Sequence, residues 1–261
     1  KEFMVRAKVP TARFVIHETF TEFKSRITQT PYPKVLKLDG LAAGKGVVIA
    51  KTEGQALDFA DAVWNKRVFG PLPQKLLEEE FIPGVELSYL GFCDGKNFIP
   101  LSSSTDFKRV YDNDEGPNTG GMGAVSPSPY HTPEIEIKIK ERIIVPILQQ
   151  LQKENFSFNG ILYIGIMIDK NGNPFVLEFN TRFGDPETQS LMMRIEGDLL
   201  PTLVSTAQGT LASAPNMTWK NETSIFVVAA SPGYPDSPKI GSPISGLDDF
   251  SADTEIFFAG V

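Results

Sequence analysis

Two side chains with metal-binding oxygens lie close together in the segment Pro174–Gln189, PFVLEFNTRFGDPETQ. Read with the two-residue period of a β-strand, Val176, Glu178 and Asn180 share one face, and the apolar residues between them share the other. A carboxylate and an amide oxygen then point the same way, and such ligands suit Mg²⁺ or Mn²⁺, with phosphates and water completing the shell. A strand that merely ends at a solvated polar rim would have the same residues, so this segment alone leaves both interpretations open.

The residues after this strand add groups that bind anions. Arg182 offers a planar guanidinium to an oxyanion. The run Gly184–Glu187 turns the chain, and Pro186 suits the first turn of a helix predicted over Pro186–Arg194.

A glycine-rich loop lies between two apolar runs in Val35–Lys51, VLKLDGLAAGKGVVIAK. It is not a P-loop, because its glycines enclose three residues where that motif needs four and Lys45 is followed by Gly46 instead of Ser or Thr. A strand also follows it, where the P-loop has a helix. The pattern predicts a hairpin whose small loop can approach a ligand closely.

Lysines on this hairpin are candidates for holding nucleotide phosphates. Lys37 lies between two leucines, where its charge would be costly to bury without an anionic partner. We therefore expect Lys37 and Lys45 to bind phosphates under a mobile glycine lid. The alternative is a surface hairpin with a lysine that reaches solvent.

An acidic strand follows at Lys75–Phe81, and Glu86–Phe92 forms the next strand. The edge at Glu79–Phe81 could offer backbone groups to an adenine ring, and Glu86 could bind ribose hydroxyls. Composition alone favours a solvated acidic strand end for Glu78–Glu80.

A polar, turn-rich stretch covers Ser102–Ser128, and loops of this length without secondary structure are usually functional or disordered. It holds cations in Thr105–Arg109 and glycines in Gly116–Ala124, a combination suited to capturing a small anion.

Periodicity and turn residues also predict the elements that must position these groups. The expected helices are Lys1–Lys8, Thr19–Ile27, Thr52–Asn65, Pro133–Glu154 with a kink at Pro146, and Asp198–Gln208. The expected strands are Arg13–His17, Asn97–Leu101, Gly160–Asp169, Ile225–Ala230 and Glu255–Ala259, with a linker at Thr210–Pro215.

Composition limits the class of protein. The 261 residues are 41% hydrophobic and 22% charged, as in an ordinary globular protein. A net charge of −7 argues against general nucleic-acid binding, and no apolar run approaches the ~20 residues that a membrane span needs. Cys93 is the single cysteine, so we expect a reducing, cytoplasmic location and no membrane partner.

The glycine hairpin, the acidic strand end and the Glu178/Asn180 strand together resemble the ATP-grasp superfamily. Within it, the segments KLDGLAAGKGV, GPNTGGMGA and LEFNTRFGDPETQ resemble those of the phosphoribosylamine–glycine ligase family of purine biosynthesis. The similarity runs from about Lys1 to Gly209 and more weakly to the end. It implies an α+β ATP-grasp fold, with two α+β subdomains that clamp ATP.

Site residues follow by position from this resemblance. It implies ATP contacts at Lys37, Gly44, Lys45, Gly46, Glu79, Glu80, Phe81 and Glu86, and Mg²⁺ or Mn²⁺ on Glu178 and Asn180. It implies binding of glycine and 5-phosphoribosylamine by Asp106, Arg109, Asn118, Thr119, Gly120 and Gly121, with catalytic roles for Lys108, Arg182 and Asp185.

The resemblance also implies a division of the chain and two departures from the family. Residues 1–30 would form the opening helix, strand and helix, 31–92 the small subdomain, 93–209 the large subdomain and 210–261 the start of a C-terminal domain. Phe107 stands where the family usually has histidine. We expect the family's N-terminal substrate domain to be absent and its C-terminal domain to be cut short.

The implied reaction is a two-step ligation by a monomeric enzyme. Glycine's carboxylate attacks the γ-phosphate of ATP to give glycyl phosphate, and the amine of 5-phosphoribosylamine then displaces phosphate. Two alternatives remain open: an ATP-grasp ligase for another acid or amine, and a nucleotide-binding module that completes no reaction.

Overall fold

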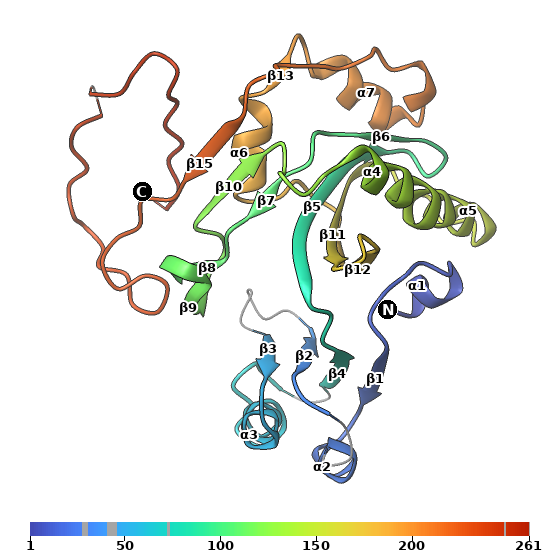
Figure 1. Ribbon diagram of the computed structural model, residues 1–261, viewed down its shortest axis with the longest axis vertical. Helices are drawn as coiled ribbons and strands as arrows, with labels where there is room; N and C mark the ends of the chain where they lie inside the picture. Colours follow the sequence, from blue (N-terminus) through green and yellow to red (C-terminus); the bar gives the residue numbers. More distant parts are fainter. Residues whose placement is uncertain (28–30, 41–45, 72–73, 248, 261) are drawn as a thin grey trace.

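The computed structural model describes residues 1–27, 31–40, 46–71, 74–247 and 249–260, and they form two lobes around antiparallel sheets (Figure 1). The smaller lobe holds strands β1–β4, and the larger holds β5, β11 and β12, with the N-terminus between the lobes. This α+β arrangement agrees with the expected fold class.

The sheet of the small lobe has the order β1-β4-β2-β3, and two helices cover it. The expected hairpin and capped helix are confirmed, and the Thr52 hydroxyl accepts a hydrogen bond from the Gln55 amide at 3.3 Å. Apolar residues of both helices pack on the leucines of β2 and β4. The elements are β1 (Phe14–His17), α2 (Phe20–Ile27), β2 (Lys34–Asp39), β3 (Val47–Ala50), α3 (Glu53–Trp64) and β4 (Lys75–Glu80).

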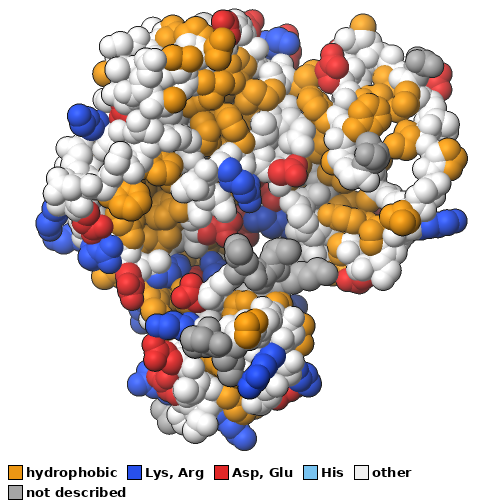
Figure 2. All heavy atoms as spheres, turned by 180° about the vertical axis from the view of Figure 1, so that it is seen from behind, with side chains coloured by type: hydrophobic (Ala, Val, Ile, Leu, Met, Phe, Trp, Pro, Cys, Tyr) orange, Lys and Arg blue, Asp and Glu red, His pale blue; other side chains and the backbone are white. Residues whose placement is uncertain are grey.

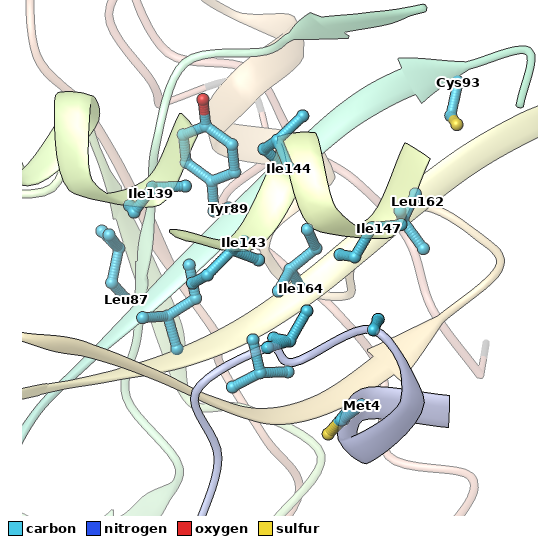
Figure 3. Close-up of a cluster of buried hydrophobic side chains, with 14 of the residues drawn as sticks. Met4, Leu87, Tyr89, Cys93, Ile139, Ile143, Ile144, Ile147, Leu162 and Ile164 are labelled. Atoms are coloured by element: carbon cyan, nitrogen blue, oxygen red, sulfur yellow. The ribbon is translucent and has the colours of Figure 1, made fainter. Parts of the chain in front are cut away.

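The sheet of the large lobe has the order β12-β11-β5-β6, and both of its faces are buried. One face packs against α1, α4 and α5 around Tyr89 and Ile164 (Figure 3). On the other face, Leu90 and Tyr163 pack with Leu191 of α6. The elements are α1 (Glu2–Arg6), β5 (Gly84–Cys93), β6 (Phe98–Pro100), α4 (Pro133–Ile139), α5 (Val145–Lys153), β11 (Gly160–Asp169), β12 (Pro174–Asn180), α6 (Glu187–Met192) and α7 (Leu200–Gln208).

Strand β5 belongs to a different lobe from the one predicted by the sequence-based division of the chain. That division placed it in the small subdomain, but β5 pairs with β11 along its whole length. The chain therefore passes from the small lobe to the large lobe between Glu80, the last residue of β4, and Gly84, the first of β5.

The long helix predicted over residues 133–154 is interrupted near Pro146. A π-helical turn, η2 (Lys140–Ile144), joins α4 to α5 directly before this proline. Proline has no amide hydrogen to donate to the preceding turn, so a local change of hydrogen bonding is the expected response.

The polar stretch Ser102–Ser128 is more ordered than its composition indicates. It contains four short strands: β7 (Thr105–Asp106), β8 (Arg109–Tyr111), β9 (Glu115–Asn118) and β10 (Gly123–Ser126). Strand β10 lies between β7 and β15 (Ser224–Val227). Strands of two to four residues are too short to show a hydrophobic alternation, so the sequence pattern missed them.

The C-terminal segment departs from two expectations. The segment predicted as a linker is packed, because Leu211 is buried and its amide donates to Asp94 Oδ2 at 3.0 Å. Strand β14 (Thr218–Trp219), which follows this segment, pairs with β13 (Ile195–Glu196). The strand predicted at Glu255–Ala259 is not formed, since no strand of the described residues pairs with this segment, which belongs to the C-terminal loop that returns to β15 (Figure 1). Phe257 packs edge-on against Phe226 of β15.

Within the described ranges, no helix has the length and apolarity required to span a bilayer.

Candidate functional site

A β-bulge in strand β12 sets the direction of the proposed metal-binding side chains. Val176 pairs with Ile166 of β11, whereas Glu178 pairs with the adjacent residue Gly165. Neighbouring residues on β11 face opposite ways, so Val176 and Glu178 lie on opposite faces of the sheet. The expectation that Val176 shares a face with Glu178 is therefore wrong, because the bulge at Leu177 breaks the period of two.

Glu178 and Asn180 do share a face, as expected. The Asn180 amide donates to Glu178 Oε1 at 3.3 Å, and this face of the sheet also carries Ser88 and Tyr163. Gly165 lies beneath Glu178, and a Cβ there would be 3.2 Å from Glu178 Cγ.

The donor chemistry of this pair fits a hard divalent cation. The described residues include no cluster of three or more His, Cys, Asp or Glu that could hold a metal. A carboxylate and an amide oxygen are the small protein contribution that Mg²⁺ needs when a phosphate and water supply its other ligands.

Lys37 extends from β2 of the small lobe to this strand of the large lobe. Its Nζ donates to the main-chain oxygen of Leu177 at 3.2 Å and lies 3.3 Å from Glu79 Oε2. A candidate phosphate-binding cation is therefore held beside the residue that precedes Glu178. The anionic partner of Lys37 in this structure is Glu79.

Lys1 is a second buried cation at this place, and the sequence pattern did not indicate it. Its Nζ lies 3.1 Å from Glu79 Oε2 and donates to Thr11 Oγ1 at 2.6 Å. Burial lowers the pKa of Lys1, against the opposing effect of Glu79. The Glu79 side chain is only 2% exposed, so the solvated strand end considered for Glu78–Glu80 does not apply to it. Its Oε1 has no hydrogen-bond partner among the described residues.

The passage between the lobes borders a pocket of about 450 Å³. Glu80 and Phe81 line it, together with Arg13 and the β11–β12 turn at Asn171. Glu80 is exposed and accepts from Arg13 Nε at 2.6 Å. The two predicted adenine-binding positions Glu80 and Phe81 thus lie at a concave surface, whereas Glu79 points elsewhere, to the lysines.

Glu86 and Lys108 form an ion pair that links β5 to the polar segment. Glu86 Oε2 lies 3.1 Å from Lys108 Nζ, and Asp106 Oδ2 lies 3.8 Å from the same nitrogen. Burial would lower the pKa of Lys108, but Glu86, Asp106 and Glu178 raise it to a greater extent. Glu86 is therefore held by a lysine in this structure.

Hydrogen bonds hold the glycine segment at Asn118–Gly121 against the cationic segment. The amide and the hydroxyl of Thr119 both donate to the Lys108 carbonyl, and the Gly121 amide donates to Thr119 Oγ1 at 3.0 Å. Arg109 pairs with Asn118 in the β8–β9 ladder, and its Nη1 donates to the Gly116 carbonyl at 2.6 Å. Gly120 belongs to the same turn. The structure therefore brings two segments of the predicted substrate site together.

Arg182 and Asp185 lie at the exposed end of the same region. Arg182 Nη1 donates to the Phe183 carbonyl at 2.7 Å, and Asp185 Oδ1 accepts from Gln189 at 2.9 Å. Both remain candidates for contact with a bound substrate.

Gly46 closes the β2–β3 hairpin by accepting from the Leu38 amide at 2.8 Å. Gly44 and Lys45 lie outside the described residues.

Glu187 is a buried carboxylate that the sequence pattern did not single out as a site residue. It accepts from Ser88 Oγ at 2.7 Å, and Ser88 Oγ lies 3.0 Å from the Tyr163 hydroxyl. Its place at the end of the run Gly184–Glu187, which is predicted to turn the chain, could have identified it as a candidate. Ser88 could have been found from its place two residues after Glu86 on the same strand face.

Comparisons with known proteins identify similar sequences and structures. Residues 1–188 match the family described as "Phosphoribosylglycinamide synthetase, ATP-grasp (A) domain". The phosphoribosylamine–glycine ligase of Xanthomonas campestris pv. campestris is 41% identical over all of this chain and 60% of its own length. That of Haemophilus influenzae is 42% identical over all of this chain and 61% of its own. The chain therefore spans about 60% of the length of these relatives.

Solved structures show the same fold. The crystal structure of phosphoribosylamine–glycine ligase from Thermotoga maritima aligns with a TM-score of 0.82 and 33% identity, covering 91% of this chain and 59% of that chain. The biotin carboxylase domain of Hydrogenobacter thermophilus 2-oxoglutarate carboxylase, solved with MgADP, aligns with a TM-score of 0.63 and 23% identity. This second match covers 86% of this chain and 48% of that chain and supports the fold alone.

Proposed function

The chain belongs to the phosphoribosylglycinamide synthetase family and carries its ATP-grasp domain, and from this premise we propose that it ligates glycine to 5-phosphoribosylamine using MgATP. The products would be glycinamide ribonucleotide, ADP and phosphate, as a step of purine biosynthesis. A cytoplasmic location without a nucleic-acid or membrane partner remains the prediction from composition, and a monomeric enzyme remains the prediction from the resemblance. The observation that supports the proposal most strongly is the approach of Lys37 to the strand of Glu178.

We place ATP between the lobes. Its phosphates would lie near Lys37 and the glycine hairpin, and its adenine near Glu80 and Phe81 at the passage between lobes. Glu79 points to Lys1 and Lys37, so it would act on the phosphate side, and Glu86 would bind the ribose after exchanging its contact with Lys108. Side chains of both charges gather around the junction of the lobes (Figure 2).

The first step would transfer the γ-phosphoryl group to glycine's carboxylate. Positioning and charge neutralisation supply most of the catalysis of phosphoryl transfer, so no nucleophilic side chain is needed. Lys37, Lys45 and Arg182 would offset the charge that develops on the transferred group. Mg²⁺ held by Glu178 and Asn180 would supply further charge neutralisation.

The second step would form the amide. The predicted substrate residues Asp106, Arg109 and Asn118–Gly121 would hold the acyl phosphate and the amine, with Lys108 and Asp185 beside them. The glycine hairpin would exclude water, which otherwise hydrolyses the acyl phosphate.

The deciding experiment measures ADP release by this chain with MgATP and glycine, with and without freshly generated phosphoribosylamine. Release that requires both substrates supports the proposal. Binding of MgATP with no glycine-dependent release would favour a nucleotide-binding module. Release with another acid or amine in a substrate screen would favour a different ATP-grasp ligase.

A further inference from the structure

The carboxyl group of Asp106 is buried near the contact between two segments of the predicted substrate site, GPNTGGMGA and FGDPETQ. The Asp106 side chain is 6% exposed, and its Oδ1 has no hydrogen-bond partner among the described residues. Its other oxygen is 3.8 Å from Lys108, a distance too long for a strong hydrogen bond. An unsatisfied buried carboxylate oxygen is costly and calls for an explanation.

Two glycines leave room for acidic side chains here. A Cβ on Gly121 would lie 2.9 Å from Asp106 Oδ1 and 2.3 Å from Pro186 Cδ. A Cβ on Gly184 would lie 2.3 Å from Glu187 Oε2. The GPNTGGMGA and FGDPETQ segments therefore meet where Gly121 lies against Pro186, with Asp106 beside Gly121. Each segment contributes a glycine that a larger residue could not replace without movement.

Negative charge dominates the surroundings of Asp106. Glu187 of α6, Glu86 of β5 and Asp185 all raise its pKa, and Lys108 lowers it. Burial is the largest cause, and the pKa of Asp106 is raised to about 7. Glu187 cannot move away easily, because Ser88 holds it by a 2.7 Å hydrogen bond. A carboxyl group in this state can accept a proton near neutral pH.

We propose that Asp106 accepts the proton released when the amide bond forms. We further propose that Glu187 is a positioning residue whose buried negative charge favours this protonation of Asp106. This inference rests on the proposed ligase function. The amine nitrogen forms a bond to the glycyl carbonyl carbon, the bond from that carbon to the phosphate oxygen breaks, and phosphate leaves with the electron pair. One proton passes from the nitrogen to the Asp106 carboxylate and later to solvent.

The test separates the two chemical steps. Hydroxylamine traps glycyl phosphate as glycine hydroxamate and reports the first step, whereas glycinamide ribonucleotide reports the second. For Asp106→Asn we expect hydroxamate within about threefold of wild type and amide formation at least ~100-fold slower, the upper range of general-base effects. Equal loss of both products would assign Asp106 to binding or to the first step and would overturn the proposal.

A second variant tests the role of Glu187. Glu187→Gln keeps an acceptor for Ser88 but removes a negative charge, so the acid limb of the pH profile for amide formation should move down by about half a unit or more. An unmoved limb would overturn the positioning role. Glu141→Gln, an exposed residue of the η2 turn, is the matched control and should leave the profile unchanged.

The wild-type protein distinguishes this inference from the proposed function. If it yields neither hydroxamate nor amide, the ligase proposal itself fails. If it yields both, only the behaviour of the variants decides the roles of Asp106 and Glu187.

Discussion

The Lys37 side chain donates a hydrogen bond of 3.2 Å to the main-chain oxygen of Leu177 and so joins the two lobes. Leu177 lies at the bulge of β12, directly before Glu178. Because the same ammonium group is 3.3 Å from Glu79, it is held from both sides. The candidate phosphate and metal sites are therefore adjacent in this structure.

Replacing Lys37 by Met should weaken nucleotide binding while the fold is kept. A hydrogen bond to a charged group contributes ~1.5–3 kcal/mol, which corresponds to a loss of roughly 10- to 100-fold in affinity. Calorimetric titration with a non-hydrolysable ATP analogue measures it. Lys24→Met, on the exposed side of α2, is the control, and equal affinities for the two variants would contradict the phosphate assignment.

Replacing Glu178 by Gln should lower ADP formation by at least ~100-fold, the scale of losing a key electrostatic group. The side chain is exposed, so thermal unfolding should change little. Steady-state ADP release and a melting curve measure the two effects. Unchanged turnover would rule out Glu178 as a metal ligand.

Replacing Gly165 by Ala should displace Glu178 without touching either candidate ligand. The added Cβ would be 3.2 Å from Glu178 Cγ, closer than ordinary contact. We expect the Mg²⁺ concentration for half-maximal ADP release to rise several-fold, since a small misplacement of a metal ligand weakens binding. Gly54→Ala, where the nearest atom is 3.8 Å away, should leave it unchanged. A similar rise in both variants would point to a general effect of the substitution.

The stability of the protein should depend on Asp106 in a defined pH range. Its pKa is about 7 in the folded protein and ~3.9 in an unfolded chain, so between these values the folded state holds a proton that the unfolded state has lost. Stability due to this residue therefore falls as pH rises from about 4 to 7.

Asp106→Asn should remove this dependence. The difference in free energy of unfolding, Asp106→Asn minus wild type, should be larger at pH 8 than at pH 4 by at least about 1 kcal/mol, as measured by urea unfolding. The exposed Asp58→Asn variant serves as the comparison. A difference that is the same at both pH values would contradict a raised pKa.

Local pattern was sufficient for most of the elements, whereas the membership of the site stays a prediction. The hairpin around Gly46 and the buried strand β11 follow from periods and turn residues that act within a few positions. Glu178 and Asn180 share a face because both follow the bulge and the period of two holds between them. The resemblance to the family also implied that Asp106 and Gly121 belong to one site.

Tertiary structure alone decided which of these groups touch. The bulge at Leu177 comes from the register of β12 on β11, and the meeting of Glu79 with Lys1 and Lys37 comes from the packing of the N-terminal segment between the lobes. The proximity of Asp106 to Glu187 likewise joins segments about eighty positions apart. Sequence periodicity describes how a segment meets its neighbours along the chain, whereas burial, pKa and ion pairing depend on contacts between distant segments.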